Sequence, residues 1–199
     1  MTTFYLIRHG STDFIGKVLV GRMPGIHLNT EGRIQASRLA ERFRGIPISR
    51  IYSSPIERAR ETAEPLSREL GIAVEIAEEV SEVEYGEWTG RPISDLLNDP
   101  AWQHYNSFRT GAHVPGGESV LELQNRLAGW LESTRRAHTD ERIAVVSHGD
   151  PIKAALAHYM GLHLDMFPRF EISPASVSVV QVNDAGACVL ALNNSELLP

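Results

Sequence analysis

Phe4-Tyr5-Leu6-Ile7-Arg8-His9-Gly10 is a short apolar run that ends in a guanidinium, an imidazole and a glycine. The apolar residues predict a buried strand, and open α/β sheets gather their functional groups at the carboxyl ends of such strands. At that position His9, with Arg8 beside it, can attack an anionic group. The tripeptide alone is equally compatible with a core histidine whose neighbouring arginine reaches into solvent.

A second apolar run, 143–146, ends in Ser147-His148-Gly149, and Pro151 then opens a predicted helix. Two strands that both end in His-Gly can lie side by side in a parallel sheet. That arrangement would bring His9 and His148 together at one edge, which favours the functional interpretation of both.

A third strand-to-helix junction lies between them, at residues 51–58. We expect Ser54 to be the N-cap of the helix, Pro55 its first residue and Glu57 the partner that closes a capping box. Arg58 then falls in the first turn, where the helix dipole favours an anion. The three junctions together outline a phosphate site made of Arg8, His9, Arg58 and His148.

Length and composition indicate a globular chain with one core. The chain has 199 residues, of which 42% are hydrophobic, and it contains no linker, repeat or low-complexity tract, so residues 1–199 are expected to form a single domain. The first strand is predicted within four residues of the start, which leaves no room for a signal peptide. No run reaches membrane-spanning length, so we expect a cytoplasmic protein without a membrane partner.

Charge and cysteine content exclude further classes. A net charge of −6 argues against nonspecific nucleic-acid binding, which requires a basic face. The single cysteine, Cys188, lies in the apolar run 187–192, which predicts a buried and inert thiol and rules out an intramolecular disulfide. The sequence does not decide whether the chain forms a homodimer through an edge strand or a surface helix.

The order of predicted elements is typical of an α/β fold. Ser119 and Glu122 predict a capping box, and residues 183–186 predict a hairpin turn that gives the sheet an antiparallel edge. Strands that are apolar throughout require helices on both faces, so we expect a three-layer α/β/α sandwich with a mostly parallel sheet. The predicted strands are 3–8, 49–53, 72–76, 142–147, 176–182 and 187–192, and the predicted helices are 30–44, 55–70, 118–137 and 150–160.

Six blocks of this chain resemble, in the same order, the histidine phosphatase superfamily, in its phosphoglycerate mutase-like branch with the Arg-His-Gly signature. Arg-His-Gly by itself would be a weak signal, but six ordered blocks make coincidence very unlikely. The resemblance covers most of the chain and implies a phosphoglycerate mutase-like fold. The blocks are residues 6–12, 21–36, 53–63, 82–90, 115–119 and 146–149.

The chemistry of phosphoryl transfer assigns roles to these residues. It requires an in-line nucleophile, cations on the equatorial oxygens and an acid for the leaving oxygen. A neutral His9 offers a ring nitrogen, and the resemblance implies a phosphohistidine intermediate. Arg8, Arg58 and a protonated His148 are expected to hold the phosphate together with Gly149. The sequence has no evident cluster of acidic metal ligands, so we expect neither a metal nor another cofactor.

The resemblance places the general acid at a carboxylate four residues before the glycine of the Tyr-Gly-x-Trp block, which is Glu82 before Gly86. Glu84 is the nearest alternative, and Glu78 and Glu79 are further neighbours. A carboxyl close to a phosphate dianion is pushed toward its protonated form by like charge, as a general acid requires.

Thr12, Phe14, Arg22 and Tyr85 are the candidate substrate-pocket residues. The family signature usually continues to an asparagine that contacts phosphate in many members, and this chain has Ile15 at that position. Ile15 cannot donate a hydrogen bond. The phosphate site therefore either lacks one donor or recruits Thr12 or Arg22.

The segment 91–114 raises two further questions. Trp88, Trp102, Tyr105 and Phe108 either line an apolar substrate pocket or pack as core. The phosphoglycerate mutases that this chain resembles carry a longer insertion over the site, and the roughly 25 residues available here are too few for such a lid.

Three functions follow as hypotheses. The first is a metal-independent phosphomonoesterase acting on small phosphorylated metabolites, in which water attacks the phosphohistidine. The second is a cofactor-dependent phosphoglycerate mutase, which resets the intermediate from a bisphosphate. The third is an inactive phospho-ligand-binding scaffold, which the retained site residues disfavour.

Overall fold

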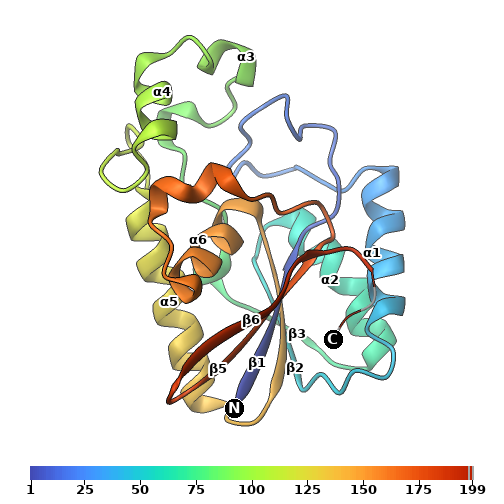
Figure 1. Cartoon of the computed structure of the whole chain (residues 1–199). Coiled ribbons are helices and arrows are strands. Elements are labelled where there is room, and N and C mark those ends of the chain that lie inside the picture. The colour runs from blue at the N-terminus through green and yellow to red at the C-terminus, as the bar shows by residue number, and fades with distance from the viewer. Residues whose placement is uncertain (197, 199) are drawn as a thin grey trace.

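A sheet of six strands forms the centre of the computed structural model, which describes residues 1–196 and 198 (Figure 1). The strand order is β3-β2-β4-β1-β5-β6. The first four strands are parallel, whereas β5 is antiparallel to β1 and β6 to β5, as predicted. The strands are β1 (Thr2–Arg8), β2 (Arg50–Ser53), β3 (Val74–Ile76), β4 (Arg142–Ser147), β5 (Val177–Asn183) and β6 (Gly186–Asn194).

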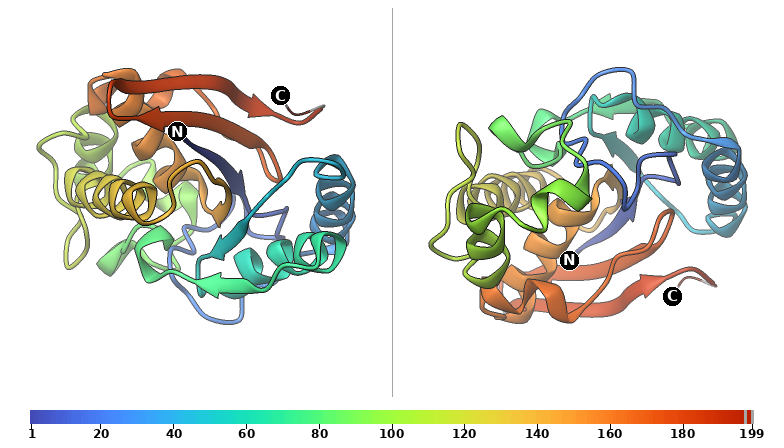
Figure 2. Two further views of the ribbon diagram at one scale, coloured as in Figure 1. Left: turned by 90° about the horizontal axis from the view of Figure 1, so that it is seen from below. Right: turned by 90° about the horizontal axis from the view of Figure 1, so that it is seen from above.

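Helices cover both faces of the sheet, which confirms the expected three-layer α/β/α sandwich. Figure 2 shows α1 and α2 on one face and α5 and α6 on the other. The α-helices are α1 (Thr30–Arg42), α2 (Glu57–Leu70), α3 (Ile93–Leu96), α4 (Pro100–Ser107), α5 (Val120–Ala137) and α6 (Gly149–Met160). Three short 3-10 helices are η1 (Glu78–Val80), η2 (Gly86–Trp88) and η3 (Leu164–Arg169).

The central strand β1 is apolar from Phe4 to Ile7, where both of its faces are buried. Phe4 and Leu6 pack into the cluster that includes α5 and α6, and Tyr5 and Ile7 pack into the cluster that includes α1 and α2. Successive side chains of a strand point to opposite faces, so this alternation follows from the pleat. The same packing holds the carboxyl end of β1 in place.

The two α-helices that were not predicted, α3 and α4, lie between β3 and α5. They are short, because α3 has four residues and α4 has eight, so neither offers enough turns for a clear helical period. The longer elements were predicted to within a few residues of their ends. The capping box of Ser119 and Glu122 is confirmed at the start of α5.

The predicted capping box at the start of α2 is wrong. The helix begins at Glu57, with Ile56 as an N-cap residue whose side chain makes no capping bond. The Ser54 hydroxyl instead lies 2.8 Å from the ring of His148, and the Glu57 carboxylate accepts the N–H of Gly25. Ser54 and Glu57 therefore bond to residues distant in the sequence and not to each other, as the capping box would require.

The prediction of a buried Cys188 is also wrong, since its side chain is exposed. Cys188 lies on β6, which pairs only with β5 and forms the outer edge of the described sheet. The apolar run 187–192 is typical of a core strand, but at an edge much of it faces solvent.

Candidate active site

The site begins where β1 and β4 end side by side. Arg8 is in register with Ser147, and the N–H of His9 donates to the Ser147 carbonyl at 2.9 Å. The residues that follow are therefore neighbours, and the ring centroids of His9 and His148 lie 5.1 Å apart. This edge lies toward the upper end of the molecule in Figure 1, beneath the loop that follows β1.

His9 presents a nitrogen without a proton. Its Nδ1 lies 2.7 Å from the Gly10 carbonyl, which can only accept, so Nδ1 carries the proton of the neutral ring. Nε2 then holds a lone pair and accepts the Nε–H of Arg58 at 3.1 Å. Burial, followed by the guanidiniums of Arg58 and Arg8, holds the pKa of His9 well below its usual range. The ring is neutral and nucleophilic at physiological pH.

Both arginines keep donors that no other described residue satisfies. Arg58 is 1% exposed and donates through Nη2 to the Gly21 carbonyl at 2.8 Å, while its Nη1 is buried without a partner. Arg8 donates through Nη1 to the Ile172 carbonyl, and its Nε is likewise buried and unpaired. Buried unpaired donors are costly, and an oxyanion between the two guanidiniums would satisfy them.

His148 adds a third unpaired nitrogen, Nδ1. The Ser54 hydroxyl accepts the Ile56 N–H, so its own proton is available to the Nε2 of His148. A neutral ring whose Nε2 accepts this proton carries its own proton on Nδ1. Burial, then Arg58, His9 and Arg8, lower the pKa of His148 well below its usual range. His148 can therefore donate as a neutral ring, without the protonation that we expected from the sequence.

Glu82 lines the same pocket, and its pKa is raised, whereas the pKa values of both histidines are lowered. Burial and then the Asp150 carboxylate raise the pKa of Glu82 to about 7, against the opposing charge of Arg58. Its Oε1 accepts the N–H of Val83 at 2.9 Å. The alternative acid, Glu84, faces Arg22 at 3.6 Å outside the pocket lining, and its side chain is 46% exposed. The geometry favours Glu82.

The pocket in front of His9 has a volume of about 250 Å³. Of the expected pocket residues, Thr12, Phe14 and Tyr85 line it, as do Ile15 and Gly149, whereas Arg22 does not. The Nε of Arg22 donates to the backbone carbonyl of Glu82 at 2.7 Å, so this arginine lies behind the acid and not beside the substrate. Thr12 is therefore the better candidate to replace the missing asparagine.

The sequence analysis missed Lys153, which lines the pocket, and the linked pair Asp150 and Arg109. Asp150 lines the pocket and accepts hydrogen bonds from the Tyr85 hydroxyl at 2.7 Å and from Nη1 of Arg109 at 3.3 Å. Its position directly after His148-Gly149 was an available signal. Arg109, buried with its guanidinium 4.4 Å from the Tyr105 ring centroid, carried no sequence signal.

None of the four aromatic residues Trp88, Trp102, Tyr105 and Phe108 lines the pocket, and the first three pack as core. Trp88 packs edge-on against Trp102 and Tyr105, and none of the three lines the pocket. Phe108 is 45% exposed. From segment 91–114 only Ile93 reaches the pocket lining.

Within residues 1–196 and 198, no group of three or more His, Cys, Asp or Glu side chains is arranged to hold a metal ion. In the same part of the chain, no helix is both long enough and apolar enough to span a membrane.

The fold and the site define an α/β protein whose parallel-strand edge presents a neutral histidine, two arginines and a protonatable carboxyl to an oxyanion. The model of the histidine phosphatase superfamily (branch 1) matches residues 4–195, so the chain belongs to this family.

Individual relatives span nearly the same length. Phosphoserine phosphatase 1 from Hydrogenobacter thermophilus is 29% identical over 97% of this chain and 92% of its own. The protein named "Probable phosphoglycerate mutase GpmB" from Salmonella choleraesuis is 28% identical over 93% of this chain and 87% of its own length. The phosphoserine phosphatase of Entamoeba histolytica, solved with phosphoserine and with 3-phosphoglyceric acid, superposes with a TM-score of 0.89 at 26% identity, over 98% of each chain.

The protonation states of the histidines are directly testable. Long-range ¹H–¹⁵N spectra should show His9 and His148 still neutral at about pH 6, where an ordinary histidine is mostly protonated. The exposed His27 provides the contrast, because its hydrogen bond with Glu61 raises its pKa. Spectra of His9→Ala and His148→Ala assign the signals. A His9 ring that is cationic at neutral pH would have no lone pair for attack and would refute its role as nucleophile.

Proposed function

We propose that this protein is a phosphomonoesterase that hydrolyses small phosphorylated metabolites through a phosphohistidine at His9. The observation that supports this most is that three buried nitrogens without a hydrogen-bond partner lie on side chains that neighbour the neutral imidazole of His9. They belong to Arg8, Arg58 and His148. Such donors are suited to the charge that develops on the equatorial oxygens of a phosphoryl group during transfer.

The first step transfers the phosphoryl group to His9. Nε2 exchanges its hydrogen bond with Arg58 for attack on phosphorus, and the bond from phosphorus to the leaving oxygen breaks. Protonated Glu82 gives its proton to that oxygen, and the alcohol departs. A carboxyl with a pKa of about 7 is protonated in a large fraction of molecules at neutral pH, as this step requires.

The second step regenerates the enzyme. Water attacks the phosphohistidine, the phosphorus–nitrogen bond breaks, and the Glu82 carboxylate accepts the proton that the water loses. Inorganic phosphate is released, His9 is again neutral, and Glu82 is again protonated. The same carboxyl thus acts first as an acid and then as a base.

The mutase hypothesis is the second candidate, because a relative of similar identity carries that name. Segment 91–114 supports the phosphatase instead, since Trp102 and Tyr105 pack in a core outside the pocket and only Ile93 of this segment reaches the pocket. With so little of that segment over the site, water can reach the intermediate.

Lys153 indicates the substrate class. It is the one lysine in the described pocket lining, and its side chain is 12% exposed. It lies one turn of α6 after Gly149, which is next to the proposed phosphate donors. Its partner Glu171, at 3.4 Å, is 77% exposed, so this ion pair is weak and easily exchanged. We propose that Lys153 meets a carboxylate of the substrate, a group that phosphoserine and 3-phosphoglycerate share.

Trapping the intermediate tests the proposed function. Wild-type protein quenched during turnover of radiolabelled phosphoserine or p-nitrophenyl phosphate should carry acid-labile, alkali-stable label, and His9→Ala should carry none and be inactive. His27→Ala is the matched control and should label normally. In a coupled assay with 3-phosphoglycerate, phosphate release should exceed isomerisation with or without added bisphosphoglycerate. Isomerisation that dominates and requires the bisphosphate would establish the mutase.

Glu82→Gln should lower kcat on the order of 100-fold or more, because a positioned acid contributes that much. Activity of the wild type should fall as the pH rises through the Glu82 pKa of about 7, since the acid form is then lost. This alkaline limb of kcat/KM should vanish in Glu82→Gln, because an amide does not ionise. The control Glu84→Gln should keep the limb. The opposite pattern would move the acid to Glu84.

Lys153→Met should raise KM for phosphoserine and 3-phosphoglycerate about 10-fold, the loss expected for one charge-assisted hydrogen bond at a partly solvated site. KM for p-nitrophenyl phosphate, which has no carboxylate, should hardly change. Kinetics with the three substrates measure this ratio. An equal effect on all three would exclude a carboxylate subsite at Lys153.

A further inference from the structure

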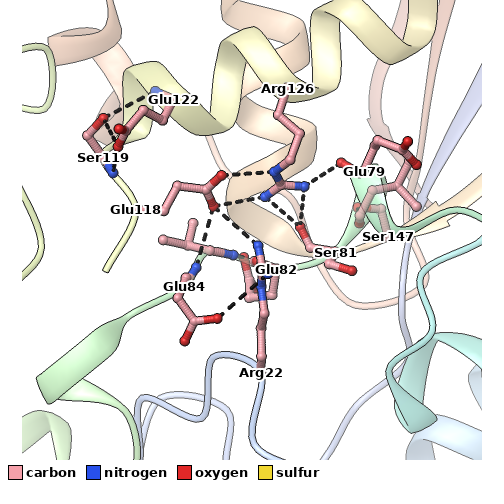
Figure 3. Close-up of polar contacts among 12 residues, drawn as sticks. Arg22, Glu79, Ser81, Glu82, Glu84, Glu118, Ser119, Glu122, Arg126 and Ser147 are labelled. Carbon is pink, nitrogen blue, oxygen red and sulfur yellow. Dashed lines mark hydrogen bonds and ion pairs between the residues drawn. The ribbon is translucent and has the colours of Figure 1, made fainter. Parts of the chain in front are cut away.

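The segment that carries Glu82 has little regular structure of its own. After η1 it continues as an irregular chain to η2, outside the sheet. Its backbone carbonyls are held by two arginines from distant parts of the sequence, as Figure 3 shows. Arg22 donates to the carbonyl of Glu82 at 2.7 Å, and Arg126 donates to the carbonyls of Glu79 and Ser81.

One carboxylate connects these two arginines. Oε1 and Oε2 of Glu118 each accept a hydrogen bond from Arg126 at 2.8 Å, in the paired geometry of a guanidinium and a carboxylate. Oε2 also lies 3.4 Å from Nη2 of Arg22. The Glu118 side chain is 14% exposed, so these interactions are screened less than those of a surface pair.

The backbone around Glu118 packs closely against the segment that carries Glu82. The N–H of Glu118 donates to the Glu84 carbonyl at 2.8 Å, and the Glu87 N–H donates to the Pro115 carbonyl at 2.9 Å. A Cβ at Gly117 would lie 2.2 Å from the Glu84 carbonyl oxygen, which no other residue could tolerate without a backbone shift. This close approach accounts for Gly117 in the block 115–119 (Pro-Gly-Gly-Glu-Ser), to which the phosphate site assigns no role.

We propose that Glu118 is a positioning residue for the general acid, and this rests on the proposed function. Its carboxylate orients Arg22 and Arg126, and these guanidiniums fix the carbonyls on either side of the Glu82 side chain. Glu118 does not line the pocket, so it acts through Glu82 and not on the substrate. A general acid must lie within hydrogen-bond reach of the leaving oxygen, so loosening this segment reduces proton transfer.

The test compares Glu118→Gln with Glu122→Gln. Glu122 is four residues away and caps α5 through Ser119, without contacting either arginine, so it controls for a general loss of stability (Figure 3). Glu118→Gln should lower kcat for an alkyl phosphate such as phosphoserine about 10-fold, a part of the full contribution of a general acid. For p-nitrophenyl phosphate the loss should be small, because the phenolate leaves without a proton. Glu122→Gln should leave both rates unchanged.

A double-mutant cycle identifies the residue through which Glu118 acts. In the Glu82→Gln background, Glu118→Gln should have no further effect on kcat, because the acid is already absent. Additive losses, or equal losses for alkyl and aryl phosphates, would overturn the proposal. Arg126→Lys, which keeps the charge but loses the paired geometry, should reproduce the alkyl-selective loss and serves if Glu118→Gln does not fold.

Hydrogen–deuterium exchange provides a measurement that does not depend on turnover. Peptides covering 79–87 should exchange faster in Glu118→Gln, and those at the start of α5 should do so in Glu122→Gln. A wild type without phosphatase activity would refute the proposed function, while exchange would still report whether Glu118 orders the segment. Unchanged exchange over 79–87 would refute the positioning role.

Discussion

The parallel pairing of β1 with β4 is the contact on which the site depends. The register that sets Arg8 opposite Ser147 delivers both histidines to one edge, and the hydrogen bond from His9 to the Ser147 carbonyl extends that register by one residue beyond the strand. A one-residue slip would turn every side chain of β1 to the other face and destroy both cores together. The packing that stabilises the fold therefore also fixes the relative position of the proposed nucleophile and the proposed phosphate donors.

Arg58 links the electrostatics of this edge to its chemistry. Burial of His9 lowers the pKa of its imidazole most, and the neighbouring Arg58 lowers it further and donates to Nε2, which marks Nε2 as the unprotonated nitrogen. The same charge opposes the rise of the Glu82 pKa, which burial and Asp150 outweigh. One site thus contains an imidazole whose pKa is lowered and a carboxyl whose pKa is raised to about 7, a separation that suits the proposed nucleophile and general acid. Asp150 is itself held by Tyr85 and Arg109, so its charge acts from a fixed place.

The sequence predicted the sheet, its antiparallel edge and the juxtaposition of the strand-end residues, because these follow from local apolar runs and short motifs. It failed where distant partners compete with local ones. Ser54 was predicted to cap a helix, but its hydroxyl lies within hydrogen-bond distance of His148 in the folded chain. Cys188 was predicted to be buried, because an apolar run does not reveal that its strand lies at the edge of the sheet. Arg109 could not be found at all, since only the folded chain brings it to Asp150.

The proposed general acid, Glu82, is held in the fold differently from the proposed nucleophile, His9. His9 follows a central strand and inherits the rigidity of the sheet, whereas Glu82 lies on an irregular segment fastened by Arg22, Arg126 and the backbone next to Glu118. Ser147 adds a link between the two, because its hydroxyl donates to the Val80 carbonyl at 2.6 Å. The sheet thus holds the proposed phosphate-binding residues, whereas Arg22, Arg126 and Glu118 hold the segment of the proposed acid. The two parts are connected near the end of β4 through Ser147. Changes in Arg22, Arg126 or Glu118 can therefore alter proton transfer while the phosphate donors keep their geometry.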